Sequence, residues 1–203
     1  MKKIEVEINK YILSKIEKPI REKTDIIILL LETINLLLTV QSSQVDEDKN
    51  KIIVYIDKMS RVIYKLENKI FSINFPFTCE IKENNISIRE GMQEIDAQVV
   101  SSLMEIILEM KDNNELDIIL EKIIELDNIY KIINKLLTYE YGYIRYDYDQ
   151  EHANGNIHPL NHLDINYMNT NQYKLGLKNR INTREFIDIL NLNTECYFLN
   201  KNP

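Results

Sequence analysis

Apolar residues in the first two thirds of the chain recur at intervals that are typical of helices. Residues 3–18 form an amphipathic pattern, and the apolar run 26–40 predicts a buried core helix that begins at the capping pair Thr24-Asp25. Further along, apolar residues follow one another at steps of four, three, four, three and four, which predicts a continuous stripe on a helix of about 20 residues. This stripe, called the 52–70 seam below, comprises Ile52, Ile56, Met59, Ile63, Leu66 and Ile70.

A short hairpin interrupts the helical pattern. Phe75-Pro76-Phe77 ends the preceding helix, and two β-prone segments, 78–81 and 86–88, flank the turn-like Glu83-Asn84-Asn85. We therefore expect a hairpin at about residues 77–89. Two more helices are expected after it, with apolar stripes formed by Val99, Leu103, Ile106 and Met110 and by Leu116, Ile119, Ile123, Leu126, Tyr130, Ile133 and Leu137.

Strict alternation of apolar and polar residues replaces this pattern after Leu137. Residues 143–149 and 162–167 alternate, residues 173–177 are a candidate third strand, and a last helix begins with Thr183 as its cap. Alternation with a period of two is typical of half-buried strands.

The patterns together predict an α+β fold. Residues 1–138 are expected to be mainly helical apart from the hairpin. Residues 139–203 are expected to form a small antiparallel β-sheet near the C-terminus, closed by a short helix and packed with the helical region as one domain.

Charge and composition narrow the function classes. The 203 residues carry 25 Lys and Arg against 32 Asp and Glu, so the net charge of -7 repels nucleic-acid phosphates and a broad groove binder is not expected. With four glycines and no phosphate-binding loop motif, a nucleotide-binding loop is not expected either. The N-terminus lacks a secretory pattern, the 26–40 run is shorter than the roughly 20 residues of a membrane span, and the two cysteines form no Cys-x-x-Cys pair. We therefore predict a cytoplasmic protein without a membrane partner.

Rare side chains gather near the C-terminus. All three histidines, His152, His158 and His162, lie within eleven residues. Because successive side chains of a strand point to opposite faces, Arg145 and Asp147 share one face, and so do His162 and Asp164 on the next strand. If the two strands pair as an antiparallel hairpin, one surface collects these four side chains, with His158 at its rim.

Two kinds of chemistry fit this group. We favour the first over metal binding because no two of the candidate ligands Asp147, His162 and Asp164 have the i, i+4 spacing of a helical metal site. In the first, His158 and His162 act as general base and acid and Arg145 binds a phosphate oxygen. Asp147 and Asp164 orient these three groups, which together are what metal-independent cleavage of RNA requires. In the second, Asp147, His162 and Asp164 hold a divalent metal ion that activates water. A non-functional interpretation also stays open, in which these residues form cross-strand pairs on the solvent face of a half-buried sheet.

The motif residues carry a family resemblance. Arg145-Tyr146-Asp147 followed by His158-Pro159-Leu160-Asn161-His162 resembles an R-x-D … H-P-x-x-H pattern near the C-terminus of uncharacterised bacterial proteins of similar length. The stretch is also loosely similar to the R-Y-D … H-x-H arrangement of TumE-type toxins, although Asp164 stands where that pattern has a further histidine. The resemblance implies a cytoplasmic protein of a mobile element, of a toxin-antitoxin pair or of phage defence. Arg145 and His152 form an R-x6-H spacing similar to that of HEPN ribonucleases, which implies a helix-end site in an all-helical dimer.

Two functional hypotheses follow. The first is a cytoplasmic phage-defence or toxin-like protein whose C-terminal sheet carries an RNA- or phosphodiester-directed site, without a cofactor unless a divalent metal is bound. The second is a non-catalytic helical subunit of a multiprotein defence or DNA-processing assembly. It would meet a protein partner, or a second copy of itself, through its helical seams.

Overall fold

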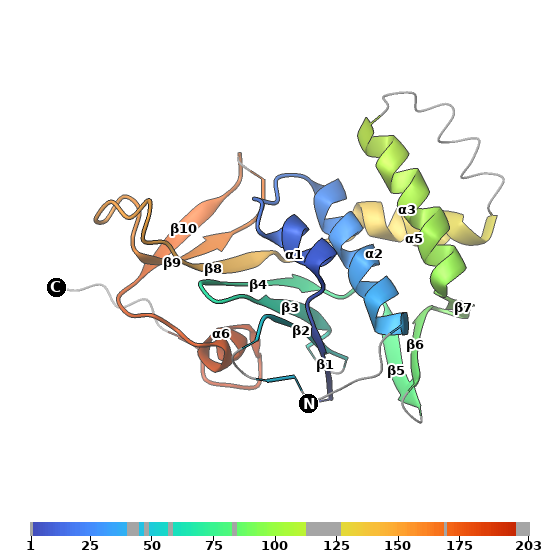
Figure 1. The fold of residues 1–203 in the computed structure, drawn as a ribbon, viewed down its shortest axis with the longest axis horizontal. Coiled ribbons are helices and arrows are strands. Elements are labelled where there is room, and N and C mark those ends of the chain that lie inside the picture. Colours follow the sequence, from blue (N-terminus) through green and yellow to red (C-terminus); the bar gives the residue numbers. More distant parts are fainter. Residues whose placement is uncertain are drawn as a thin grey trace.

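A seven-stranded antiparallel sheet runs through the whole chain (Figure 1). The computed structural model describes residues 2–39, 45–46, 49–56, 59–82, 85–112, 127–168 and 170–197. The large sheet has the order β1 (Lys3–Glu7), β2 (Lys51–Tyr55), β3 (Arg61–Lys65), β4 (Lys69–Asn74), β8 (Ile144–Tyr148), β9 (Asn161–Ile165) and β10 (Tyr173–Leu177). A second, three-stranded sheet consists of β5 (Thr78–Lys82), β6 (Asn85–Glu90) and β7 (Gln93–Glu94). The described helices are α1 (Lys10–Ile16), α2 (Lys23–Thr39), α3 (Ala97–Asp112), α5 (Asp127–Thr138) and α6 (Thr183–Leu190).

This architecture contradicts the predicted fold class, α+β with a mainly helical N-terminal two thirds and a small C-terminal sheet. The 52–70 seam is not a helix, because its residues are distributed over β2, β3, β4 and the connections between them. These strands are buried on both faces, so they carry nearly continuous apolar runs such as Ile52–Tyr55 instead of alternation. Such runs, placed one after another, reproduced a helical spacing by coincidence.

The amphipathic helix predicted for residues 3–18 is also wrong in its first half. Ile4 and Val6 point into the core from β1, which pairs with β2, and the Asn9 side chain then caps α1 by accepting from the backbone N–H of Ile12. Residues 3–7 alternate between polar and apolar, which is the period of a strand, and the polar Asn9 separates them from the short helix.

Other predicted elements are confirmed. The core helix corresponds to α2, the hairpin to β5 and β6, the helix after it to α3, and the three C-terminal strands to β8, β9 and β10. The last helix begins at Thr183, but its cap is Asn182, which forms a capping box with Glu185. Of the helix expected over 116–137, the part from Asp127 onward is present as α5, whereas its earlier residues and the turn at 83–84 lie outside the described residues.

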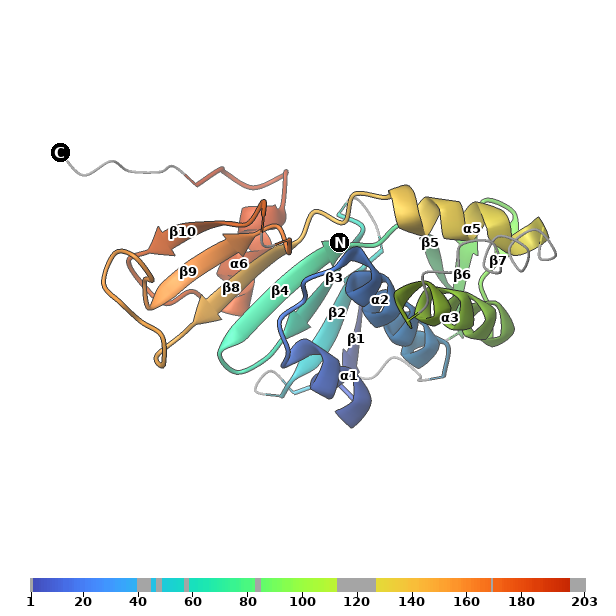
Figure 2. The same cartoon turned by 90° about the horizontal axis from the view of Figure 1, so that it is seen from above.

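The two faces of the large sheet are covered by different helices. One face packs against α1 and α2 through side chains such as Ile52, Val62 and Phe71. The opposite face packs against α6, whose Phe186 is fully buried among Ile63, Tyr146 and Leu163. Figure 2 shows α1 and α2 over the end of the sheet that holds β1 to β3, while β8 to β10 lie at the other end. Among the described residues, no helix combines the length and the apolarity needed to cross a bilayer.

Candidate functional site

Polar side chains line two neighbouring rows across β8, β9 and β10. In one row, β-sheet register places Asp147 opposite His162, and His162 opposite Gly176. In the other row, Arg145 lies opposite Asp164, and Asp164 opposite Lys174. The structure therefore brings together the four residues that strand alternation placed on one face.

Arg145 holds the two carboxylates together. Its Nε donates to Oδ2 of Asp147 at 2.7 Å, and its guanidinium also bonds Oδ2 of Asp164. Burial alone would lower the pKa of Arg145, but Tyr143, Asp147 and Asp164 outweigh it, so the pKa is raised. The guanidinium predicted to bind phosphate is thus already engaged by two carboxylates from its own chain.

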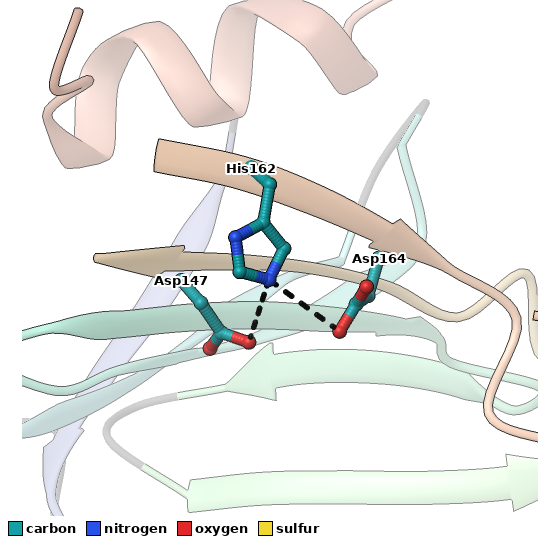
Figure 3. A group of neighbouring side chains, drawn as sticks. All are labelled: Asp147, His162 and Asp164. Atoms are coloured by element: carbon teal, nitrogen blue, oxygen red, sulfur yellow. Dashed lines mark ion pairs between the residues drawn. The ribbon is translucent and has the colours of Figure 1, made fainter. Parts of the chain in front are cut away.

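Figure 3 shows His162 between Asp147 and Asp164. The His162 side chain is almost completely buried. Its Nδ1 is 2.8 Å from the backbone oxygen of Pro159, and since a carbonyl only accepts, Nδ1 carries a hydrogen. Its Nε2 faces Oδ2 of Asp147 at 3.7 Å and Oδ2 of Asp164 at 3.9 Å. The ring orientation is therefore fixed by the backbone of the loop that precedes β9.

His158 lies at the rim, as predicted, and 27% of its side chain is exposed. Its Nε2 is 3.1 Å from Oδ2 of Asp149, and its ring meets that of His162 edge to face at 4.7 Å. His152 is 71% exposed and also contacts Asp149. Burial would raise the pKa of Asp149, but hydrogen bonds from His152 and His158 lower it to about 2. Asp149 therefore anchors His158 at the rim of the group.

Lys174 is the member of the group that the sequence analysis missed. Its Nζ lies 3.3 Å from Nδ1 of His158, 3.4 Å from Nε2 of His162 and 3.6 Å from Oδ1 of Asp164. About one third of the side chain is exposed, so Lys174 closes the group toward solvent. The sequence does carry a signal for Lys174, because alternation along residues 173–177 places Lys174 and Gly176 on one face of the third strand.

Gly176 has no side chain, and the loop between β8 and β9 occupies the space that a side chain would fill. A Cβ atom at this position would lie 2.9 Å from Cγ of Pro159, closer than ordinary contact. Pro159 in turn supplies the carbonyl that orients His162. The glycine thus lets the loop between β8 and β9 close over the polar rows.

Candidate metal ligands are present in the same place. Ligand atoms of Asp147, His162 and Asp164 all lie within 4.8 Å of one another. However, the Oδ2 atoms of both carboxylates already bind Arg145. Within the part of the chain that the structure describes, Oδ1 of Asp164 is a buried oxygen without a hydrogen bond.

Two alternatives from the sequence fit the geometry less well. An ordinary solvent-exposed polar face is contradicted, because His162 and Asp164 have only 1% of their side chains exposed. For the HEPN resemblance, Arg145 lies inside strand β8 and His152 in the loop after it, whereas the resemblance implies a helix end.

Comparisons of the chain with protein-family models, with curated proteins and with solved structures found no match.

Proposed function

We propose that the β8–β10 site cleaves phosphodiester bonds in RNA without a metal ion. The observation that carries the proposal is the position of Lys174, whose ammonium lies between Nδ1 of His158 and Nε2 of His162. Two imidazoles and one ammonium in mutual contact supply an acid, a base and a positive charge, which are the groups that this reaction needs.

Lys174 takes the phosphate-binding role that the sequence analysis gave to Arg145. The Arg145 guanidinium is committed to Asp147 and Asp164, whereas the Lys174 side chain reaches the solvent side of the group. An ammonium beside a phosphoryl oxygen stabilises the charge that develops in the transition state. Because the protein as a whole is acidic, such local cationic groups would have to attract the substrate.

The two histidines supply the proton transfers. His158 is the base, since it is the more exposed of the two rings and Asp149 fixes its orientation. It accepts the proton of a ribose 2′-hydroxyl, the 2′ oxygen bonds to phosphorus, and the bond from phosphorus to the 5′ oxygen breaks. His162, when protonated, gives its proton to the leaving 5′ oxygen. The products are a 2′,3′-cyclic phosphate and a 5′-hydroxyl.

The surrounding carboxylates have positioning roles. Asp147 and Asp164 lie within 4 Å of His162 Nε2 and are themselves held by Arg145. Charge-paired, buried neighbours of this kind fix a catalytic ring without competing for its substrate. A cytoplasmic toxin or phage-defence role is the biological setting that we propose for such an activity.

The alternative of a non-catalytic helical subunit has less support. It relied on helical seams as apolar surfaces. The 52–70 seam belongs to strands and their connections and is mostly buried in the sheet. The stripes of α3 and α5 contribute buried residues such as Leu103, Ile106 and Ile133 to the core. Association of the chain with a partner or with a second copy remains a prediction from the sequence.

The test is cleavage of a mixed-sequence RNA oligonucleotide by purified protein in the presence of a chelator. We expect fragments that end in a 2′,3′-cyclic phosphate, detected by mass spectrometry. His158→Ala should slow cleavage by about 10²-fold or more, because general acid-base catalysis contributes at least that factor. His152→Ala, in the same loop, is the matched control and should cleave normally. Intact RNA, or equal rates for both variants, would overturn the proposal.

A further inference from the structure

We infer that the group around Lys174 is also a binding site for a divalent transition-metal ion, in which the Lys174 ammonium occupies the position of the metal. Three acceptor atoms surround this ammonium, namely His158 Nδ1, His162 Nε2 and Asp164 Oδ1. The site differs from the Asp147, His162 and Asp164 group considered above, because it uses His158 and the other oxygen of Asp164. It does not rest on the proposed function, since metal binding is measured without substrate.

Both imidazoles are oriented as metal ligands are. Metal-binding histidines generally donate the hydrogen of their second nitrogen to a carbonyl or a carboxylate. Here His162 Nδ1 donates to the backbone oxygen of Pro159, and His158 Nε2 faces Oδ2 of Asp149 at 3.1 Å. In this arrangement the free lone pairs of both rings point toward one cation, Lys174.

Asp164 supplies an independent observation. Only 1% of its side chain is exposed, and its Oδ1 has no hydrogen-bond partner among the described residues. A buried carboxylate oxygen without a hydrogen-bond partner has lost its water contacts and gained nothing in their place. Lys174 Nζ lies 3.6 Å from this oxygen, too far to form a hydrogen bond. A metal ion at this point would satisfy the oxygen.

Two imidazole nitrogens and one carboxylate oxygen select the class of ion. Such ligand sets suit Zn²⁺, Co²⁺ and related first-row ions, whereas Mg²⁺ and Ca²⁺ prefer oxygen ligands. The present distances of 3.3 to 3.6 Å fit an ammonium. A metal requires ligands at about 2.0–2.2 Å, so Lys174 must leave and the rings must move inward. The backbone of His158, in the loop between β8 and β9, is bridged to Asn154, so the inward movement falls on its side chain.

The experiment is a titration of the full-length, tag-free protein with Co²⁺, read by visible absorption and by the number of ions bound per chain. Lys174→Met should bind one Co²⁺ about tenfold or more tightly than the unmodified protein, because the competing positive charge is gone. His158→Ala in the Lys174→Met background should lose the absorption bands.

Matched controls separate this site from adventitious chelation. His152→Ala in the same background keeps Asp149 and the loop, so it should bind as tightly as Lys174→Met alone. Equal affinity of Lys174→Met and unmodified protein would overturn the inference. Loss of binding on His152→Ala, with retention on His158→Ala, would also overturn it. Neither result depends on RNA cleavage, so failure of the metal site and failure of the proposed function are distinguishable.

Discussion

Phe71 and Arg145 lie opposite each other on β4 and β8 and on the same face of one sheet, yet they belong to different kinds of interior. Phe71 stacks on Tyr64 at 4.5 Å within the apolar core under α1 and α2. Arg145 continues the row with Asp164 and Lys174. The change from one kind of interior to the other therefore takes place between two adjacent strands.

The two interiors are stabilised in different ways. The apolar half gains free energy from each buried side chain separately, whereas the polar half is stable only if every buried charge keeps its partner. Buried ion networks of this kind are weak evidence for added stability, because hydrophobic residues of similar size usually do as well. The polar rows at β8 to β10 are thus better explained by a function than by the needs of folding.

The largest expected effect on stability is the loss of Arg145. Arg145→Met leaves Asp147 and Asp164 buried without their shared cation, so the free energy of unfolding should fall by about 3–5 kcal/mol. Urea denaturation measures this change. Arg184→Met, at an exposed position of α6, is the control and should stay within about 0.5 kcal/mol of the unmodified protein.

A triple variant tests whether the polar interior depends on charge pairing. Adding Asp147→Leu and Asp164→Leu to Arg145→Met removes the unpaired charges and should recover most of the lost stability. A single Arg145→Met variant as stable as the unmodified protein would show that the carboxylates do not depend on this arginine.

An intermediate effect is expected at Gly176, where the covering loop touches the sheet. Gly176→Ala places a methyl group 2.9 Å from Cγ of Pro159, and such overpacking should cost about 1–3 kcal/mol in unfolding free energy. Pro159→Ala removes the contact atom, so the double variant should be more stable than Gly176→Ala. If both variants unfold at the same urea concentration, the loop does not depend on this close approach.

The smallest effect is expected at Asp149, which anchors His158. Its folded pKa of about 2 lies below the ordinary value of 3.8, so its hydrogen bonds stabilise the fold above pH 3.8 and this contribution is lost as the pH falls toward 2. Asp149→Asn should destabilise by up to about 1 kcal/mol near neutral pH, since the group is partly exposed. The difference between the two proteins, measured by thermal unfolding, should shrink as the pH falls below 3.8 and vanish only below pH 2. A difference that persists there would contradict the assigned cause.

The candidate site was more predictable than the fold because its strands are amphipathic. In β8 and β9, polar and apolar residues alternate, so the common face of Arg145, Asp147, His162 and Asp164 followed from the period alone. In β2 to β4 both faces are buried, so no period of two was present and the 52–70 spacing indicated a helix.

The burial of the polar face could not be predicted from the sequences of the individual strands. His162 is buried because the loop carrying Pro159 closes over Gly176, a contact between segments whose relative placement depends on the sheet register. The role of Arg145 depends likewise on its position opposite Asp164. Lys174 could have been found by extending the alternation to β10, where it lies opposite Asp164.

We propose that the polar rows at β8 to β10 cleave RNA and do not merely stabilise the sheet. The most direct measurement compares RNA cleavage in chelator with unfolding free energy for Lys174→Met, whose side chain is partly exposed. If these rows cleave RNA, Lys174→Met should lose cleavage by about 10²-fold or more while its unfolding free energy changes by no more than about 1 kcal/mol. Cleavage that is unchanged in Lys174→Met, or absent from the unmodified protein, would contradict the proposal.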